Sequence, residues 1–303
     1  MIAGVNLADD MLQTLAQALA GAPVPRVRAL HLPPSPWNGS KDGEFGALEL
    51  DDGALGLSYV LLDGALADLA QAPLGASLAG ADALELAQGW AYGTGAQRAL
   101  GFAAVNALTR HLFDRVGYVP PAATDSIAGL APQHGEHIGM IGFFPPLVKQ
   151  VTTHGARLTV LELRPELAGP REGFHITMDA RELQGCDKVL STSTVLLNDT
   201  LDEVLAHCEG ARAFAMIGPG AGCLPDPLFR RGVTLLGGTW IHDAAGFKRA
   251  LAAGAPWSEH AHKVAIDRAA YPGLDALRAA AGRSTSRPKA RASISARSRA
   301  SSA

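Results

Sequence analysis

The sequence reads IGMIGFFPPLV from residue 138 to residue 148, an apolar run followed directly by two prolines. Four more apolar runs follow in the same half of the chain: LTVLEL (158–163), KVLST (188–192), AFAMI (213–217) and VTLL (233–236). The five runs begin 20, 30, 25 and 20 residues apart, the spacing of strands that alternate with helices in a parallel sheet. Because they do not alternate apolar with polar residues, we expect helices on both faces of the sheet. These runs predict a Rossmann-like domain over residues 122–282.

The first 121 residues have a different order of elements. Apolar residues at helical spacing predict three helices, at residues 7–20, 83–92 and 97–116. Short β-like runs predict three strands, at residues 27–32, 45–50 and 55–62. Asp52 and Gly53 separate the last two runs and indicate a hairpin. This order predicts a separate α+β domain over residues 1–121.

Composition places the chain among folded globular proteins, since 48% of its 303 residues are apolar and 18% are charged. No apolar run approaches the roughly 20 residues that cross a bilayer, and no basic residue precedes Arg26. The three cysteines (Cys186, Cys208 and Cys223) form no C-x-x-C pattern and suit a reducing compartment. We therefore expect a cytoplasmic protein with no membrane partner.

The net charge of −3 conceals a basic C-terminal segment. Residues 283–303 carry six Arg or Lys side chains and no acid, which leaves the remainder of the chain at −9. A segment rich in Ser, Ala and Arg without apolar periodicity is expected to be a disordered tail. Because no aromatic residues lie between its charges, we expect it to be solvated rather than bound to nucleic acid.

The loops after the five apolar runs form the candidate ligand site, because ligands of open parallel sheets bind beyond the carboxyl ends of the strands. Glu162 ends the second run, 20 residues after Gly142, where nucleotide-binding domains keep an acid for a ribose hydroxyl. The other candidates in these loops, in chain order, are Gly142, Phe144, Pro145, Thr192, Asn198, Gly218, Pro219 and Asp243.

A structural role competes with ligand binding at the first two loops. Pro145 and Pro146 have no N–H group, so this helix start lacks two of the donors that usually hold a pyrophosphate. Glu162 is able to pair with Arg164 or Arg157 instead of a ligand.

Helix caps and turns are the alternative at the later loops. Thr200 and Glu203 fit a capping box, and Asp243 fits the N-cap of a helix over residues 244–251. The glycine-rich segment 218–223 is able to present N–H groups to an anion or to form a simple turn. Thr192 and Asn198 are not needed by the cap, so both remain available to a ligand.

Histidine pairs do not amount to a metal site in the sequence. The local pairs are His134 with His137, His260 with His262, and His207 with Cys208. A metal needs three or four convergent ligands, and none of these pairs has a partner at structural-zinc spacing. The sequence also has no G-x-G-x-x-G, P-loop, G-x-S-x-G or H-E-x-x-H pattern.

Several of these motifs, taken in order, resemble a known family. The putative heavy-metal chelation domain is similar to residues 138–148, to 158–163 with Pro165, to 192–201, to 218–219, and to 232–238 with Asp243. Its companion domain, itself similar in fold to the N-terminal domain of enolase, resembles residues 52–58 and 98–108. The resemblance implies an α/β protein with an enolase-N-terminal-like domain, a Rossmann-like domain and a ligand site in the cleft between them.

The first functional hypothesis is that this cleft binds a metal ion or a metal-chelate small molecule. Such binding would serve metal homeostasis, or the biosynthesis of a metallophore or cofactor, with a divalent transition metal as the ion. Glu162, Asn198 and Thr192 would supply oxygen atoms, and Asn106 would reach in from the helix over residues 97–116. Hard oxygens alone bind divalent cations weakly and without selectivity, which counts against tight direct chelation.

The second hypothesis is an enzyme that acts on a nucleotide-like or amino-acid-derived molecule in the same cleft. Glu162 would hold a ribose or an amine, and the N–H groups near Gly142 and Gly218 would stabilise an anion. A third reading is a scaffold protein whose basic tail recruits a partner. Each reading is compatible with a homo-oligomer, and the sequence identifies neither the substrate nor the reaction.

Overall fold

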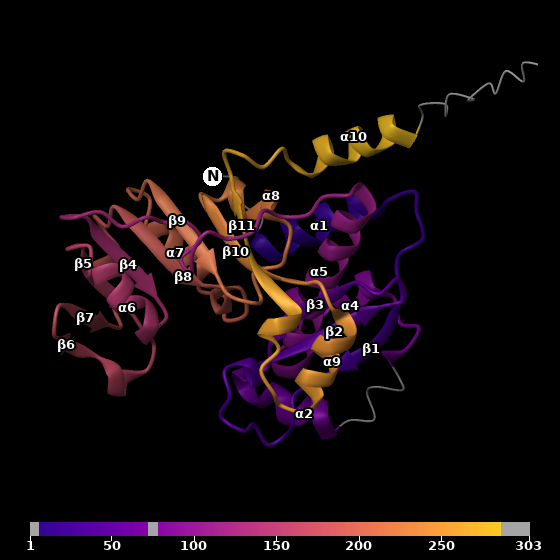
Figure 1. Cartoon of the computed structure of the whole chain (residues 1–303), viewed down its shortest axis with the longest axis horizontal. Helices are drawn as coiled ribbons and strands as arrows, with labels where there is room; N and C mark the ends of the chain where they lie inside the picture. Colours follow the sequence, from indigo (N-terminus) through magenta and orange to yellow (C-terminus); the bar gives the residue numbers. More distant parts are fainter. Residues whose placement is uncertain (1–5, 72–77, 286–303) are drawn as a thin grey trace, which may run out of the picture.

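The computed structural model describes residues 6–71 and 78–285. Two sheets dominate it, a large one in the C-terminal half of the chain and a small one in the N-terminal half (Figure 1). The expected α/β class, with a parallel-dominated sheet and a separate antiparallel one, is confirmed.

The five apolar runs form five mutually parallel strands, as predicted. These strands are β4 (His137–Ile141), β5 (Arg157–Leu161), β8 (Lys188–Thr192), β9 (Ala213–Ile217) and β10 (Leu235–Ile241). The order across the sheet is β11-β10-β9-β8-β4-β5-β7-β6. After β4 the chain moves outward to β5 and then returns to β8 on the other side of β4. The gap between β4 and β8 is therefore the switch point, where ligands of doubly wound sheets bind.

Three strands of the large sheet were not predicted from the sequence: β6 (Gly169–Arg171), β7 (Phe174–Thr177) and β11 (Ala261–Asp267). Strands β6 and β7 are only three and four residues long, and Pro170 in β6 is tolerated because that strand is the sheet edge. Strand β11 pairs antiparallel with β10 at the opposite edge.

Helices follow four of the five parallel strands: α6 (Pro145–Thr152), α7 (Leu201–His207), α8 (Pro225–Arg230) and α9 (Ala244–Ala252). The expected helix between β5 and β8 is absent, since every residue there is described. The connection instead contains β6, β7 and two 3-10 helices, η3 (Pro165–Leu167) and η4 (Ala180–Leu183). Part of the spacing that suggested a helical crossover is thus occupied by a hairpin.

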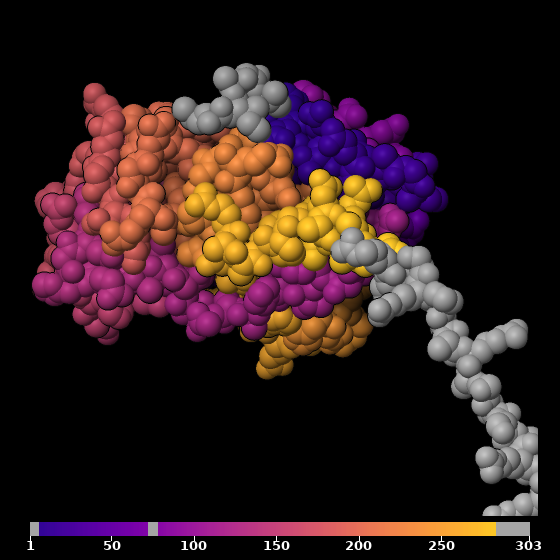
Figure 2. All heavy atoms as spheres, turned by 90° about the horizontal axis from the view of Figure 1, so that it is seen from above, coloured from indigo at the N-terminus to yellow at the C-terminus, as the bar shows by residue number. Residues whose placement is uncertain are grey.

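The C-terminal helix α10 (Leu274–Thr285) lies across the surface of the molecule, where Leu274 is buried (Figure 2). It extends past residue 282, so the first three residues of the expected disordered tail belong to a helix. Residues 286–303 lie outside the described residues. Among the described helices, none combines the length and the apolarity that a bilayer crossing requires.

The N-terminal half forms a three-stranded antiparallel sheet with its helices. Its strands are β1 (Val27–His31), β2 (Phe45–Leu50) and β3 (Leu55–Tyr59). Its α-helices are α1 (Leu7–Leu19), α2 (Ala65–Gln71), α4 (Ala83–Tyr92) and α5 (Gly95–Val116), and a 3-10 helix η1 (Asp42–Glu44) precedes β2. The predicted hairpin between β2 and β3 is confirmed, with Gly53 at φ +92° in its turn.

Helix α5 is the central element of this half, and most of its residues from Ala99 to Phe113 are buried. It lies so close to β3 that a Cβ on Gly56 would be 2.1 Å from the backbone nitrogen of Ala107. On another side, a Cβ on Gly101 of α5 would be 2.2 Å from the nitrogen of Trp90 in α4. Glycine is therefore required for the backbones to approach this closely.

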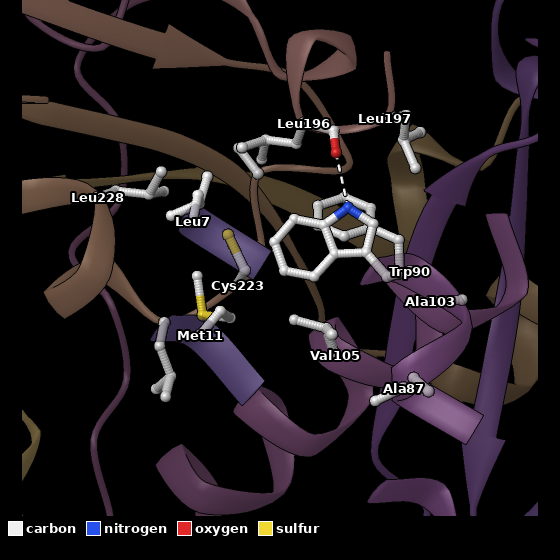
Figure 3. Packing of buried hydrophobic residues seen from close by; sticks show 14 of the residues in the cluster. Leu7, Met11, Ala87, Trp90, Ala103, Val105, Leu196, Leu197, Cys223 and Leu228 are labelled. Carbon is white, nitrogen blue, oxygen red and sulfur yellow. Dashed lines mark hydrogen bonds between the residues drawn. The ribbon is translucent and has the colours of Figure 1, made fainter. Parts of the chain in front are cut away.

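The two halves share a hydrophobic core (Figure 3). Leu7 and Met11 of α1 and Trp90 of α4 are buried in the same cluster as Leu228 of α8 and Cys223. The indole Nε1 of Trp90 donates a hydrogen bond of 2.6 Å to the Leu196 carbonyl oxygen. The polar end of the indole is thereby satisfied inside the core, as burial of tryptophan requires.

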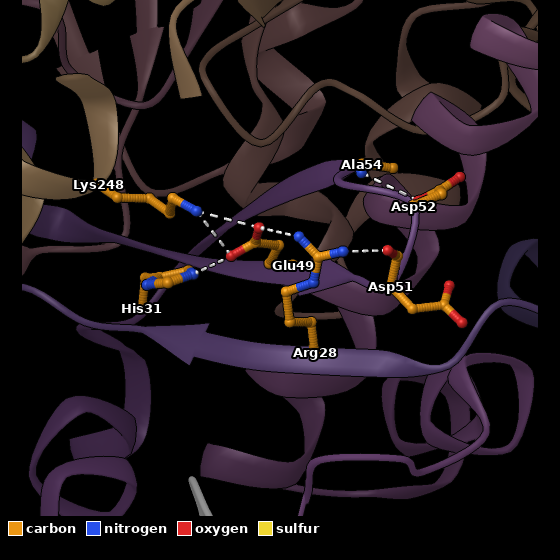
Figure 4. Close-up of polar contacts among 7 residues, drawn as sticks. All are labelled: Arg28, His31, Glu49, Asp51, Asp52, Ala54 and Lys248. Atoms are coloured by element: carbon orange, nitrogen blue, oxygen red, sulfur yellow. Dashed lines mark hydrogen bonds and ion pairs between the residues drawn. The ribbon is translucent and has the colours of Figure 1, made fainter. Parts of the chain in front are cut away.

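A buried carboxylate also connects the halves (Figure 4). Glu49 of β2 accepts hydrogen bonds from Lys248 of α9 at 3.0 Å, from His31 at 2.7 Å and from Arg28 at 3.2 Å. Burial favours a higher pKa for Glu49, but the contacts with Lys248 and His31 outweigh it and lower the pKa. Helix α9 follows β10 in sequence but packs on the small sheet through Phe247 and Leu251.

The close approach at Gly56 predicts the effect of a single added methyl group. Gly56→Ala is expected to lower the free energy of unfolding by about 3 kcal/mol, because the methyl group meets backbone atoms that cannot move aside. Gly210→Ala is the control, since a Cβ there meets nothing within 4 Å, and it should change stability by less than about 0.5 kcal/mol. Chemical denaturation measures both, and equal stabilities would refute the packing argument.

Candidate functional site

A cavity of about 1220 Å³ lies at the carboxyl ends of the parallel strands. It exceeds the roughly 300–1,000 Å³ of most small-molecule sites, so it has room for an organic ligand. Its walls come from both halves of the chain, with the loops after β4, β5, β8, β9 and β10 on one side and parts of residues 41–62 on another. Eight of the ten residues expected at the site line this cavity: Gly142, Phe144, Pro145, Glu162, Thr192, Asn198, Gly218 and Pro219.

The switch point forms part of the cavity wall. Gly142 follows β4 with φ +82°, and a Cβ on it would be 3.1 Å from Cγ2 of Thr192 at the end of β8. Phe144 is the N-cap residue of α6, and Pro145 and Pro146 occupy its first turn. The helix start therefore offers apolar surface and few N–H donors, which disfavours a pyrophosphate at this position.

Glu162 connects the first two loops. Its Oε2 accepts from the Phe143 N–H at 3.0 Å, and its Oε1 accepts from the Arg164 N–H at 3.2 Å and pairs with the Arg164 guanidinium at 3.3 Å. Burial raises the pKa of this carboxyl, but the hydrogen bonds from Arg164 and Phe143 outweigh it, and the pKa of Glu162 is lowered. Glu162 therefore lines the cavity and also holds the loop after β4 in place.

The loop after β8 uses its polar side chains internally. Thr192 Oγ1 accepts from the Thr194 N–H at 3.2 Å, and Asn198 Oδ1 accepts from Thr200 Oγ1 at 2.7 Å. The expected capping box is wrong, because Thr200 makes no side-chain cap and Glu203 faces the cavity. The Thr200 hydroxyl is instead held by Asn198.

Two expected residues lie outside the large cavity. Asp243 caps α9 by accepting from the Gly246 N–H at 2.9 Å, and it also pairs with His260 at 2.9 Å. Asn106 is 3% exposed and lines a separate, smaller cavity. The loop after β9 lies between the two cavities, since Pro219 lines both of them.

Sequence reasoning missed the residues that the N-terminal half, β11 and the segment just before β11 bring to the cavity: Glu44, Tyr59, Trp257, His262 and Lys263. Burial raises the pKa of Glu44. Burial also raises the pKa of Tyr59, and the nearby Glu44 carboxylate adds to this effect. No local pattern in the sequence marks Glu44 and Tyr59, because only the docking of the two halves brings them to the strand ends.

The donor atoms that the structure describes do not fit a bare heavy-metal ion. All three cysteines are free and buried, and burial raises the pKa to about 11 for Cys186 and to about 12 for Cys208 and Cys223. They are therefore neutral thiols at pH 7, whereas a soft metal binds the thiolate. Within residues 6–71 and 78–285, no three His, Cys, Asp or Glu side chains are grouped so as to hold a metal ion.

Fold and cavity together define a two-part α/β protein with a ligand-sized cavity at the switch point of a Rossmann-like sheet. Two family profiles, both described as putative heavy-metal chelation, match residues 44–109 and 126–269. The chain belongs to this family.

One individual protein is similar in sequence to about half of this chain. An uncharacterised protein of Methanocaldococcus jannaschii is 31% identical over 149 residues, which are 48% of this chain and 56% of that protein. The alignment therefore spans little more than half the length of this relative.

Two solved structures of proteins of unknown function from the DUF364 family have the same fold. The Desulfitobacterium hafniense protein is 22% identical with a TM-score of 0.62, covering 85% of this chain and 98% of its own. The Pyrococcus horikoshii protein is 19% identical with a TM-score of 0.65, covering 86% of this chain and 100% of its own.

The contacts of Glu162 predict a pH-dependent loss of stability. Because its folded-state pKa is lowered, its stabilisation is complete well above pH 4.5 and is lost as the pH falls through the folded-state value. Glu162→Gln should therefore cost about 2 kcal/mol at pH 7, where the charged hydrogen bonds are lost. The difference from the parent should shrink as the pH falls below 4.5.

Denaturant titrations between pH 3 and pH 8 test this expectation. The exposed Glu166 in η3 provides the control, and Glu166→Gln should have the stability of the parent throughout. A Glu162→Gln deficit that is the same at every pH would show that the charge of Glu162 is not involved.

Proposed function

We propose that this protein binds a small organic molecule in the large cavity, and that any metal it handles arrives inside such a molecule. The observation that carries the proposal is the contrast between a cavity of about 1220 Å³ and a donor set without a metal-binding group among the described residues. A bare ion needs a few convergent ligands and little space. A metal chelate needs a large cavity and no protein donor to the metal.

The acidic side chains that line the cavity are largely engaged by protein groups. Glu162 pairs with Arg164, and Asp179 pairs with Arg181 at 2.7 Å. The Asp125 carboxylate accepts hydrogen bonds from two backbone N–H groups. The charges of Glu162 and Asp179 are therefore balanced locally, and Asp125 is held by the backbone, which supports a neutral or weakly charged ligand over a free cation.

The mouth of the cavity carries apolar side chains in contact with solvent. Leu163 and Met178 line it and are 56% and 48% exposed, among the most exposed large apolar residues described. Phe143 and Phe144 also line the cavity. Exposed apolar groups at a concave site favour a ligand with an apolar part.

An enzyme that acts on a nucleotide-like or amino-acid-derived molecule in the same cavity is the second candidate. Glu44 supports it, because a carboxyl whose pKa is raised by burial exchanges protons nearer to neutral pH. Turnover of a bound molecule that stops in Glu44→Gln, with binding retained, would establish this role.

Binding of the neutral dye Nile red to the full chain tests the proposal. The variant Leu163→Asp with Met178→Asp should weaken dye binding about tenfold, because it places carboxylates on the apolar mouth. Val119→Asp is the matched control, since Val119 is 60% exposed and lies outside the cavity lining. Equal loss in both variants would show that the dye does not report on the cavity.

Two further measurements separate a bare ion from an organic ligand. Native mass spectrometry of freshly purified protein should show a retained organic mass, with or without a metal. Calorimetric titration with Cd²⁺ should show no tight binding, because the thiols are neutral. Nanomolar Cd²⁺ binding that is lost when the cysteines are replaced by serine would overturn the proposal.

A further inference from the structure

A second, much smaller cavity adjoins the large one. Its volume is about 40 Å³, enough for a group of a few heavy atoms, since one water-sized probe needs roughly 10–15 Å³. Its lining shares Pro219, Gly238, Thr239 and Val264 with the large cavity. The two spaces therefore border each other at these four residues, which lie in the loop after β9 and within β10 and β11.

Asn106 places a hydrogen-bond acceptor without a partner beside this small cavity. Its side-chain amide donates to the carbonyl oxygens of Leu57 at 2.6 Å and Gly220 at 3.0 Å. Two carbonyl acceptors fix which end of the side chain is nitrogen and which is oxygen. Asn106 is 3% exposed, and its Oδ1 accepts no hydrogen bond from any group in the described part of the chain.

An unsatisfied buried acceptor is costly, at about 1–3 kcal/mol, so a donor that reaches it is favoured. Gly222 lines the same cavity, and a Cβ on Gly222 would be 3.8 Å from Asn106 Oδ1. This glycine therefore leaves open the space next to the acceptor.

The remaining lining determines the charge of the group that fits. Arg110 is the one charged side chain among the described lining residues, and both oxygens of Asp114 already accept from its Nε at 3.0 and 2.8 Å. Its Nη1 donates to the Ile241 carbonyl oxygen, and its guanidinium lies 3.7 Å from the Trp240 ring centre. The cavity thus offers neither a free cation for an anion nor a carboxylate for an ammonium group.

We propose that the small cavity is a subsite for a neutral hydrogen-bond-donating group, a carboxamide or a hydroxyl, at one end of the ligand. The donor would face Asn106 Oδ1, with the hydroxyl of Thr239, which lines both cavities, as a second partner. This inference rests on the proposed function, because the rest of the ligand would occupy the large cavity.

Acetamide is a suitable probe, since it carries the expected group and is small enough for the subsite. In NMR titrations of the ¹⁵N-labelled full chain, acetamide should shift the side-chain amide signals of Asn106 saturably. Acetate has nearly the same shape but no donor at neutral pH, and methylammonium has donors but a net charge. Neither should shift these signals, and a saturable response to either one would overturn the proposal.

Gly222→Ala provides the matched variant. Its Cβ would lie 3.6 Å from Asn106 Cγ, an ordinary contact, so the methyl group fills the space without strain. Acetamide affinity should fall at least about tenfold in Gly222→Ala and stay unchanged in Gly210→Ala. Because the comparison of the three probes on the parent chain needs no variant, the proposal stays testable if Gly222→Ala does not fold.

Dye binding and the acetamide response together distinguish a failure of the subsite proposal from a failure of the proposed function. Nile red binding without any acetamide response would keep the large cavity as the ligand site and refute the subsite. An acetamide response without dye binding and without a retained organic mass would keep the subsite and refute the large cavity as the ligand site.

Discussion

The close approach of helix α5 to its neighbours is the constraint on which the rest of the structure depends. Gly56 lets the backbone of β3 lie against α5, and Gly101 lets α4 do the same on another side. With α5 fixed in this way, Asn106 reaches two backbone carbonyls, one in β3 and one in the loop after β9. The same helix therefore organises the N-terminal half and positions a loop of the C-terminal half.

The two halves are held together by interactions that neither could make alone. Trp90 donates to Leu196 inside a shared core, and Glu49 binds Lys248 of a helix that follows β10. Docking removes apolar surface from water on both sides, which is the main favourable term in such association. It also brings residues 41–62 over the strand ends, so the walls of the large cavity depend on this interface.

The side chains of the described residues are not those expected for direct chelation of a heavy-metal ion, which is the activity in the family description. Heavy-metal chelation by a protein usually relies on thiolates or on several convergent imidazole and carboxylate groups. Here the thiols are buried and neutral at pH 7, and at the cavity Glu162 and Asp179 pair with arginines while Asp125 accepts from backbone N–H groups. A ligand that supplies its own metal donors agrees with both the family description and this arrangement.

The sequence by itself determined the parallel strands, the hairpin at Asp52 and Gly53, and the strand ends at which eight of the ten expected site residues meet. These features follow from local periodicity and from the fact that parallel strands end at the same edge of a sheet. The sequence did not reveal β6 and β7, because strands of three and four residues carry little periodic signal, or β11, whose buried and exposed residues do not alternate regularly. Only the tertiary structure brought Glu44 and Tyr59 to the cavity and assigned Asn106 to a second one. Those positions depend on how two separately patterned halves dock, and docking is a long-range packing outcome that no local pattern encodes.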